Sequence, residues 1–274
     1  MTITTEVENF PGYPEGVTGQ QMMDDLQKQA ERFNTVVRYG DVTEVDLSKR
    51  PFKVIIDYKH QIEAETVIIA TGATAKYLGL PSEEKYKNAG VSACATCDGF
   101  FYRGKDVAVV GGGDTACEEA LYLAGLCRKV YMIVRRNELR ASKAMQDRVF
   151  NTSNIEMMWE TQTKEILGDK TVTGVLLHTK DGDKELAVSG FFLAIGHHPN
   201  SELFTQWLET DSNGYLITIP GSSKTCVEGV FACGDVQDPV YRQAITAAAS
   251  GCMAAIDAER YLLTQRPSYV RAGV

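Results

Sequence analysis

Short apolar runs bounded by turn residues recur along most of the chain, and this pattern predicts strands separated by turns and a few helices. Residues 67–70 and 191–195 are apolar throughout, which is typical of strands buried on both faces of a sheet. Helical spacing of apolar residues over 115–124 and 143–150 predicts helices between strands. The alternation of strands and helices along the chain predicts an α/β fold. Other strands are expected at 36–39, 42–46, 52–58, 65–70, 106–110, 130–134, 155–159, 163–167, 172–179, 185–188 and 229–233.

The first helix is expected to begin after Thr18, because Thr18 and Gln21 fit the pattern of a capping box. Ahead of it, residues 1–12 read as an extended connection, without the apolar strand that normally opens an α/β domain. His60 is expected at a turn between two strands. The expected buried side of the helix consists of apolar residues at helical spacing: Met22, Met23, Leu26, Ala30 and Phe33.

A glycine-rich turn at 111–116 follows the strand at 106–110 and leads into a helix that opens at Thr115, a context specific for dinucleotide binding. Gly111 makes the turn, and Gly113 lets the backbone approach a pyrophosphate. Ala116 lets the helix pack closely, so that its first amides face the anion. We therefore expect a nucleotide site at this turn.

Three arginines, Arg135, Arg136 and Arg140, follow the second strand of this unit. An acidic residue normally binds the ribose hydroxyls of NAD at this place, about twenty residues beyond the turn. Arginines favour a 2′-phosphate instead, so the sequence predicts a preference for NADPH over NADH. The alternative is a solvated basic turn, because arginine is usually a surface residue.

Two residues separate Cys94 from Cys97, a spacing that lets the sulfurs cycle between disulfide and dithiol without refolding. Asp98 is a candidate to shuttle a proton to or from a thiolate. Half a zinc site and a chance pair are the alternatives. Zinc needs a second ligand pair at a suitable spacing, whereas the other cysteines lie singly and His197 and His198 are adjacent. We expect a redox pair and no metal.

The composition of the chain argues against some classes of protein function. The chain has 274 residues, of which 44% are hydrophobic and 23% are charged, enough for two globular domains. A net charge of −8 argues against nucleic acid as the main partner. No apolar run approaches a membrane span, and the first residues lack the features of a signal peptide. A cytoplasmic protein without membrane contact is expected, and one close cysteine pair fits a reducing compartment.

The last part of the chain carries a second candidate ligand edge. Asp235 follows the strand at 229–233, and carboxyl ends of strands are where open α/β sheets bind ligands. The turn at Gly72 also follows an apolar strand. A small-residue helix begins near Arg242, and its positive N-terminal end can face an electron-rich ring. An ordinary alanine-rich core helix is the alternative.

These motifs occur in an order that resembles bacterial-type, low-molecular-weight thioredoxin reductases, and the resemblance runs nearly end to end. It implies electron transfer from NADPH through FAD to the disulfide and then to thioredoxin. Cys97 is then the sulfur nearer the flavin, Cys94 attacks thioredoxin, and Asp98 is the acid. The motifs are Val-Glu-Asn-Phe-Pro-Gly, Ile-Ile-Ala-Thr-Gly-Ala, Tyr-Leu-Gly-Leu-Pro-Ser-Glu, Cys-Ala-Thr-Cys-Asp-Gly-Phe-Phe-Tyr, Gly-Gly-Gly-Asp-Thr-Ala, Arg-Arg, Ala-Ile-Gly-His, Gly-Val-Phe-Ala-Cys-Gly-Asp-Val and Tyr-Arg-Gln-Ala-Ile-Thr.

The resemblance also implies a fold of two Rossmann-like, three-layer nucleotide-binding domains. The NADPH domain, residues 79–197, is inserted into an N-terminally truncated FAD domain made of 1–78 and 198–274. A homodimer is implied. Because the cysteines and the nucleotide turn lie in one inserted domain and each must reach the same flavin, that domain is expected to swing about 78–81 and 196–199. The expected NADPH residues are Gly111, Gly113, Thr115, Ala116, Arg135, Arg136 and Arg140, and the expected FAD residues are Asn9, Gly72, Asp235, Arg242, Gln243 and Ala244.

The sequence departs from the family at its start. Family members open with a strand, a Gly-x-Gly-x-x-Gly/Ala turn and a helix that hold the ADP half of FAD, and this unit is missing from the sequence. Its loss is expected to leave the strands near 66–70 and 230–233 with an unpaired edge. The missing unit motivates one alternative function, an inactive, flavin-free NADPH-binding fragment. A separate alternative is a related reductase of the same build that serves a peroxiredoxin-type partner.

Overall fold

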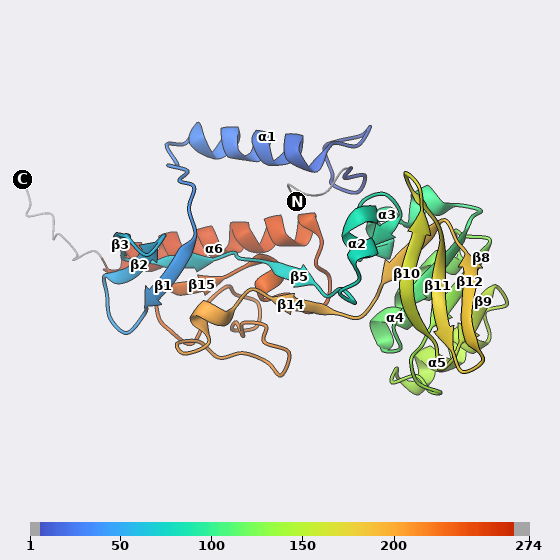
Figure 1. Ribbon diagram of the computed structural model, residues 1–274. Coiled ribbons are helices and arrows are strands. Elements are labelled where there is room, and N and C mark those ends of the chain that lie inside the picture. Colours follow the sequence, from blue (N-terminus) through green and yellow to red (C-terminus); the bar gives the residue numbers. More distant parts are fainter. Residues whose placement is uncertain (1–5, 266–274) are drawn as a thin grey trace, which may run out of the picture.

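The computed structural model describes residues 6–265, and these form two lobes joined by a pair of strands (Figure 1). One lobe is built around a five-stranded sheet. The other contains the first part of the chain and its last long helix. Part of the extended opening expected at 1–12 lies outside the described residues. Within the described residues, no helix is long and apolar enough to cross a membrane.

The larger sheet is parallel throughout, with strand order β6-β13-β7-β8-β9. The apolar runs in its strands predicted burial on both faces, because both faces of a parallel sheet are covered by other layers. In β7, Val107, Ala108 and Val109 are fully buried. The strands are β6 (Val91–Ser92), β7 (Asp106–Val110), β8 (Lys129–Ile133), β9 (Ile155–Met158) and β13 (Gly190–Leu193).

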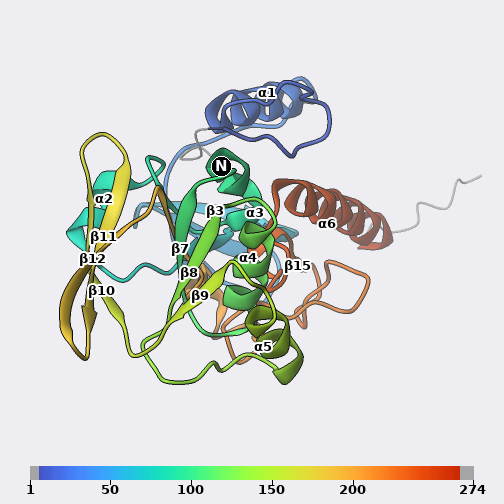
Figure 2. The same ribbon diagram turned by 90° about the vertical axis from the view of Figure 1, so that its right-hand side faces the viewer.

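Helices cover one face of this sheet and an antiparallel meander covers the other, which gives the three layers expected (Figure 2). Helix α4 places Ala116, Ala120 and Leu123 against the sheet, and small residues allow the close contact. On the opposite face, Val175 and Leu177 of the meander pack against Phe191. The helices are α4 (Asp114–Ala124) and α5 (Lys143–Phe150), and the meander is β10 (Gln162–Gly168), β11 (Val172–Thr179) and β12 (Gly182–Ala187).

The second lobe contains a short parallel pair, β4 and β15, with a meander on one side and α6 on the other. Phe52 and Leu208 close the core against Val230, and Ala254 of α6 packs on Phe231 from the other face. The elements are β1 (Val42–Asp46), β2 (Phe52–Ile56), β3 (His60–Ala64), β4 (Val67–Ile69), β15 (Val230–Ala232) and α6 (Ala244–Gln265).

Three local predictions were wrong in this lobe. Residues 36–39 form no strand, since no described segment pairs with them, and Tyr39 is 86% exposed. Helix α1 (Gly19–Glu31) begins after Thr18 as expected, yet of its predicted buried side only Met22 is fully buried, and Phe33 beyond it is 70% exposed. His60 opens β3 and is not in a turn. An amphipathic pattern identifies a face but not a partner for it.

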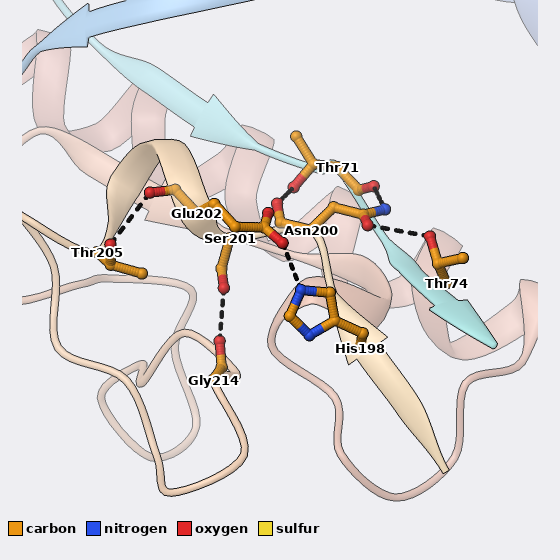
Figure 3. Close-up of polar contacts among 8 residues, drawn as sticks. All are labelled: Thr71, Thr74, His198, Asn200, Ser201, Glu202, Thr205 and Gly214. Carbon is orange, nitrogen blue, oxygen red and sulfur yellow. Dashed lines mark hydrogen bonds and ion pairs between the residues drawn. The ribbon is translucent and has the colours of Figure 1, made fainter. Parts of the chain in front are cut away.

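Two antiparallel strands, β5 (Ala73–Ala75) and β14 (His197–Pro199), connect the lobes. Asn200 fixes them on the side of the lobe that contains β4 and β15. Its amide donates to Thr71 O at 2.8 Å, and Thr74 Oγ1 donates to Asn200 Oδ1 at 3.0 Å (Figure 3). Beyond β5, the chain enters α2 (Pro81–Tyr86). The pair is therefore held firmly at one end.

A buried carboxylate fixes the other end of this connection between the lobes. Glu83 is 3% exposed, and its two carboxylate oxygens accept the backbone amides of Leu78 at 2.9 Å, Gly79 at 2.8 Å and Leu80 at 2.9 Å. Charge-assisted bonds to consecutive amides hold a segment rigidly. The stretch predicted as a hinge at 78–81 is thus tied to the lobe of the five-stranded sheet.

Candidate functional site

Cys94 and Cys97 form a disulfide, with their Cα atoms 5.3 Å apart. The pair spans the first turn of the short helix α3 (Ala95–Asp98), where Cys97 N lies 3.2 Å from Cys94 Sγ. The 3₁₀ helix η1 (Gly99–Tyr102) follows. No group of three potential metal ligands occurs among the described residues. The geometry is that of an exchangeable dithiol pair.

Ionisable groups with altered proton affinity surround the disulfide. Burial raises the pKa of Asp98, and a hydrogen bond with the Ser92 side chain partly opposes this shift. Burial and the nearby Asp98 charge raise the pKa of Tyr102 to about 12. Burial also raises the pKa of Glu119 on α4 to about 7, and its Oε2 has no partner among the described residues. The sequence identified only Asp98 among these groups, because Tyr102 and Glu119 are brought near the disulfide by tertiary packing.

Residues distant in sequence meet at this disulfide. Gln243, in the segment before α6, places its Nε2 3.9 Å from Cys94 Sγ and 3.5 Å from Thr96 Oγ1. Its Oε1 accepts a hydrogen bond from Asn9 Nδ2 at 3.0 Å. Two residues expected at the FAD site therefore lie beside the redox pair.

The glycine turn has the shape that its sequence predicted. Gly111 has φ +148°, and a Cβ there would lie 2.4 Å from Ala194 O and 2.7 Å from Ala116 Cβ. Gly113 has extended backbone, and a Cβ there would meet nothing within 4 Å. Gly111 is therefore needed for the fold, whereas Gly113 leaves backbone open to a ligand beside the first turn of α4, where Thr115 lies.

A cavity of about 440 Å³ opens from this turn. Gly111 lines one side, and Arg135, Arg136 and Arg140 line another. Within the described part of the chain, no ion pair or side-chain hydrogen bond engages these three arginines, so their charge is available to a phosphate. Glu138 is the acidic residue of the wall. The open glycine backbone and the unpaired guanidinium groups fit NADPH.

Replacing Gly111 by alanine is expected to lower the free energy of unfolding by roughly 2–4 kcal/mol, because the new methyl group meets backbone and core atoms. The control is Gly113→Ala, which is expected to change it by less than about 1 kcal/mol but to weaken NADPH binding about tenfold. Urea unfolding and fluorescence titration measure the two effects. Equal destabilisation by both variants would contradict this account of the turn.

The second predicted ligand site, at the carboxyl ends of β4 and β15, is also present. Strands β4 and β15 are parallel, so the turn at Gly72 and the carboxylate of Asp235 lie at the same edge of their sheet. A Cβ on Gly72 would meet nothing within 4 Å. No hydrogen bond from a described residue reaches the Asp235 carboxyl, and burial and the Asp238 charge raise its pKa. These groups, with Ala244 opening α6, fit the ring-bearing half of FAD.

His197 lies in β14 and not in a loop. Its Nδ1 is buried and has no partner among the described residues. Burial, with the charges of Arg242 and Lys76, lowers the pKa of His197 to about 4. Its adjacency to His198 gave no sign of burial, because strand pairing with Ala75 brings this about.

This histidine makes stability depend on pH. Its pKa is about 4 in the folded chain and about 6.5 in an unfolded one, so the unfolded chain binds more protons between these values. The stability that neutral His197 contributes is full above pH 6.5 and is lost as the pH falls through 4. We expect His197→Gln to reduce the fall in melting temperature between pH 7 and pH 4.5, measured by calorimetry. His60→Gln, at an exposed site, is the control, and equal slopes for both variants would refute the role of His197.

Known proteins share this arrangement. Residues 1–251 match the family of pyridine nucleotide-disulphide oxidoreductases. A thioredoxin reductase of Dictyostelium discoideum is 51% identical over 96% of this chain and 84% of its own. The structure of thioredoxin reductase from Giardia duodenalis aligns with a TM-score of 0.90 at 44% identity, over 96% of this chain and 86% of that one.

A further solved structure aligns with a lower TM-score. The thioredoxin reductase of Lactococcus lactis in its FR conformation covers 96% of this chain and 87% of its own at 36% identity, with a TM-score of 0.61. The expected resemblance to low-molecular-weight thioredoxin reductases and the two-domain, Rossmann-like fold are confirmed by these matches. The chain belongs to the pyridine nucleotide-disulphide oxidoreductase family, whose thioredoxin reductases use FAD and NADPH.

Proposed function

We propose that this chain is an NADPH-dependent thioredoxin-disulfide reductase. One observation carries the proposal: the Cys94–Cys97 disulfide lies on the lobe with the dinucleotide turn and contacts Gln243 of the other lobe. The dithiol pair lies between the two candidate nucleotide sites. Electron transfer from a nicotinamide to a protein disulfide needs this arrangement. The relatives named thioredoxin reductase support thioredoxin as the partner.

Two sets of residues would hold the cofactors. Gly111 and Gly113 would leave room for the pyrophosphate of NADPH at the first turn of α4, where Thr115 and Ala116 lie, and the arginines would hold its 2′-phosphate. Asn9, Gly72, Asp235 and the segment 242–244 would hold the ring-bearing half of FAD. When bound, FAD supplies the two-electron relay between the nicotinamide and the disulfide.

The reduced cysteine pair then performs the exchange. The Cys94 thiolate attacks the thioredoxin disulfide and forms a mixed disulfide, and one thioredoxin sulfur leaves as a thiolate. Asp98, whose pKa is raised by burial, is placed to give that thiolate a proton. The Cys97 thiolate attacks Cys94 Sγ, which releases the second thioredoxin sulfur and restores the disulfide. Two electrons have then passed to thioredoxin.

The lobes must separate for this exchange, because Gln243 contacts Cys94 Sγ in the present arrangement. Asn200 fixes one end of the crossing strands, and Glu83 fixes residues 78–80. We therefore place the flexible joints at 76–77 and 195–196, and not at 78–81 and 196–199 as first expected. The lower TM-score of the Lactococcus lactis structure, over the same share of this chain, supports lobes that adopt two relative orientations.

The resemblance leads us to propose three further properties. The NADPH domain comprises residues 79–197, and the FAD domain comprises 1–78 and 198–274. The protein acts as a homodimer, since the family resemblance implies one. Its compartment is the cytoplasm, where a reducing environment keeps a single dithiol pair available for exchange.

Visible absorption tests this function. The purified protein is mixed with FAD, reduced with NADPH without oxygen, and then given oxidised thioredoxin. Flavin bands that bleach and recover are expected. A colourless protein that still binds NADPH would refute the proposal in favour of a flavin-free module. Recovery with a peroxiredoxin-type disulfide protein, but not with thioredoxin, would refute thioredoxin as the partner.

A further inference from the structure

Hydrogen-bond donors from both lobes converge on one sulfur of the disulfide. The Cys97 amide donates to Cys94 Sγ at 3.2 Å, and Gln243 Nε2 donates to the same sulfur at 3.9 Å. Thr96 Oγ1 lies 3.4 Å from it, and the Thr96 hydroxyl is the donor there because a disulfide sulfur carries no hydrogen. Among the described residues, none of the hydrogen bonds to the disulfide reaches Cys97 Sγ. The two sulfurs therefore have different surroundings.

The carboxamide of Gln243 is held so that its NH₂ group faces the disulfide. Its Oε1 accepts a hydrogen bond from Asn9 Nδ2 at 3.0 Å, and its Nε2 donates to Tyr241 O at 3.2 Å. A carbonyl oxygen can only accept, so the opposite orientation of the carboxamide would place two acceptors together. The second hydrogen of Nε2 is left for the other lobe, where Cys94 Sγ and Thr96 Oγ1, the latter at 3.5 Å, share it.

Reduction of the disulfide changes what these donors face. The two electrons that NADPH supplies break the bond between the sulfurs and leave each sulfur with a negative charge, which a proton can neutralise. A disulfide sulfur is a weak, neutral acceptor, whereas a hydrogen bond to an ionised group is about twice as strong as one between neutral groups. The three donors therefore favour a negative charge on Cys94 Sγ over one on Cys97 Sγ.

We propose that Gln243 is a catalytic residue of disulfide reduction: it donates a hydrogen bond to Cys94 Sγ and, with Thr96 and the Cys97 amide, stabilises the thiolate that forms there when the S–S bond breaks. Cys94 is then the leaving sulfur, and Cys97 is the sulfur that receives the electrons, in agreement with the roles that the family resemblance implies. This inference rests on the proposed function for the source of the electrons.

The set of three donors is complete only while the lobes are together. Gln243 belongs to the lobe of β4 and β15, and Thr96 and both cysteines belong to the other lobe. When the lobes separate for thioredoxin, the Cys94 thiolate loses the Gln243 donor and keeps the donors of its own lobe. A thiolate that loses a donor becomes more basic and more nucleophilic. Cys94 is thus a better leaving group with the lobes together and a better nucleophile with the lobes apart.

Four charged or titratable groups lie on elements packed around the cysteine turn and interact with a charge there. They are Asp98 of α3, Tyr102 of η1, Glu119 of α4, which packs on α3, and Arg242, the neighbour of Gln243 in the chain. None of these four groups is substituted in the test. Their effect on Cys94 is therefore common to every variant and cancels in the comparison.

The test measures the reactivity of Cys94 and needs neither FAD nor thioredoxin. The full chain carries Cys97→Ala, which removes the second thiol but keeps its backbone amide. Alkylation by iodoacetamide between pH 5 and pH 10 is followed by the mass of the tryptic peptide 88–103, whose one remaining cysteine is Cys94. Because the thiolate is the reactive form, the midpoint of the rate profile gives the pH at which half of Cys94 is ionised. The plateau gives the nucleophilicity of the thiolate.

Gln243→Leu is expected to raise this midpoint by about half a pH unit, which is about threefold in the ionisation constant, because one donor to the thiolate is lost. The plateau rate should also rise, by less than about twofold, since the thiolate becomes more basic. Gln243→Glu replaces the donor by a negative charge at nearly the same volume and should raise the midpoint by about one unit or more. Thr96→Val should act in the same direction as Gln243→Leu, and Thr96→Ser should restore the midpoint.

The matched control is Gln237→Leu, because Gln237 lies in the same lobe as Gln243 and donates its side-chain amide to Gly234 O at 3.3 Å. It should leave midpoint and plateau unchanged. An unchanged midpoint in Gln243→Glu would overturn the proposal, even if Gln243→Leu failed to fold. A change in the plateau alone would also overturn it, since that reports altered access to the sulfur. A chain that passes this test but does not reduce thioredoxin would refute the proposed function alone.

Discussion

Replacing Cys97 by serine is expected to abolish thioredoxin reduction, by at least about a thousandfold, and to trap thioredoxin on Cys94. The remaining Cys94 thiolate can still attack the disulfide of thioredoxin. Release requires a second thiolate within bonding distance, and Cys97 is the only partner that the disulfide geometry provides in the described chain. A stable mixed disulfide, seen as a mass increase of one thioredoxin under non-reducing conditions, is the expected product.

Controls separate the two roles of the cysteines. Cys94→Ser should abolish turnover equally but form no thioredoxin adduct. Cys252→Ser removes an exposed cysteine outside the pair and should leave turnover unchanged. An adduct with Cys94→Ser, and none with Cys97→Ser, would show that the roles are reversed.

The double variant Arg135→Ala/Arg136→Ala is expected to lower kcat/KM for NADPH by about a hundredfold to a thousandfold, with kcat/KM for NADH nearly unchanged. Both guanidinium groups line the nucleotide cavity, and neither has an ion-pair partner among the described residues. Each charge-assisted bond to a phosphate contributes about 1.5–3 kcal/mol. Steady-state kinetics with each nucleotide measure the change.

A matched control for the arginines is Arg128→Ala. Arg128 lies outside the cavity and pairs with Asp106, at 2.7 Å from Nε to Oδ1. This change removes one positive charge but should leave the preference for NADPH intact. If the double variant kept the same ratio of NADPH to NADH efficiency, the 2′-phosphate assignment would be wrong.

Local features could be predicted from the sequence because short-range chemistry determines them. The conformation of Gly111 follows from the turn between β7 and α4, and the α5 boundaries follow from helical periodicity. The Cys94–Cys97 pairing needed only the two-residue spacing between them. In each case the residues that decide the geometry lie within one turn of each other.

The contacts around the disulfide could not be predicted because packing between lobes produces them. Gln243 and Cys94 are 149 positions apart, and no local pattern in either segment indicates the contact. The burial of Glu83 could not be predicted either, because Ser82, Glu84 and Lys85 around it make a polar run.

The two-stranded ribbon of β5 and β14, which connects the lobes, determines which relative motions of the lobes are easy. Cross-strand hydrogen bonds, including Lys76 N to Gly196 O at 2.9 Å, hold its two chains side by side. A paired ribbon this short keeps its two chains at a fixed spacing, so rotation takes place at the joints proposed beyond its ends. Such rotation can exchange the faces that the lobes present, while the ribbon keeps the distance between the lobes nearly constant.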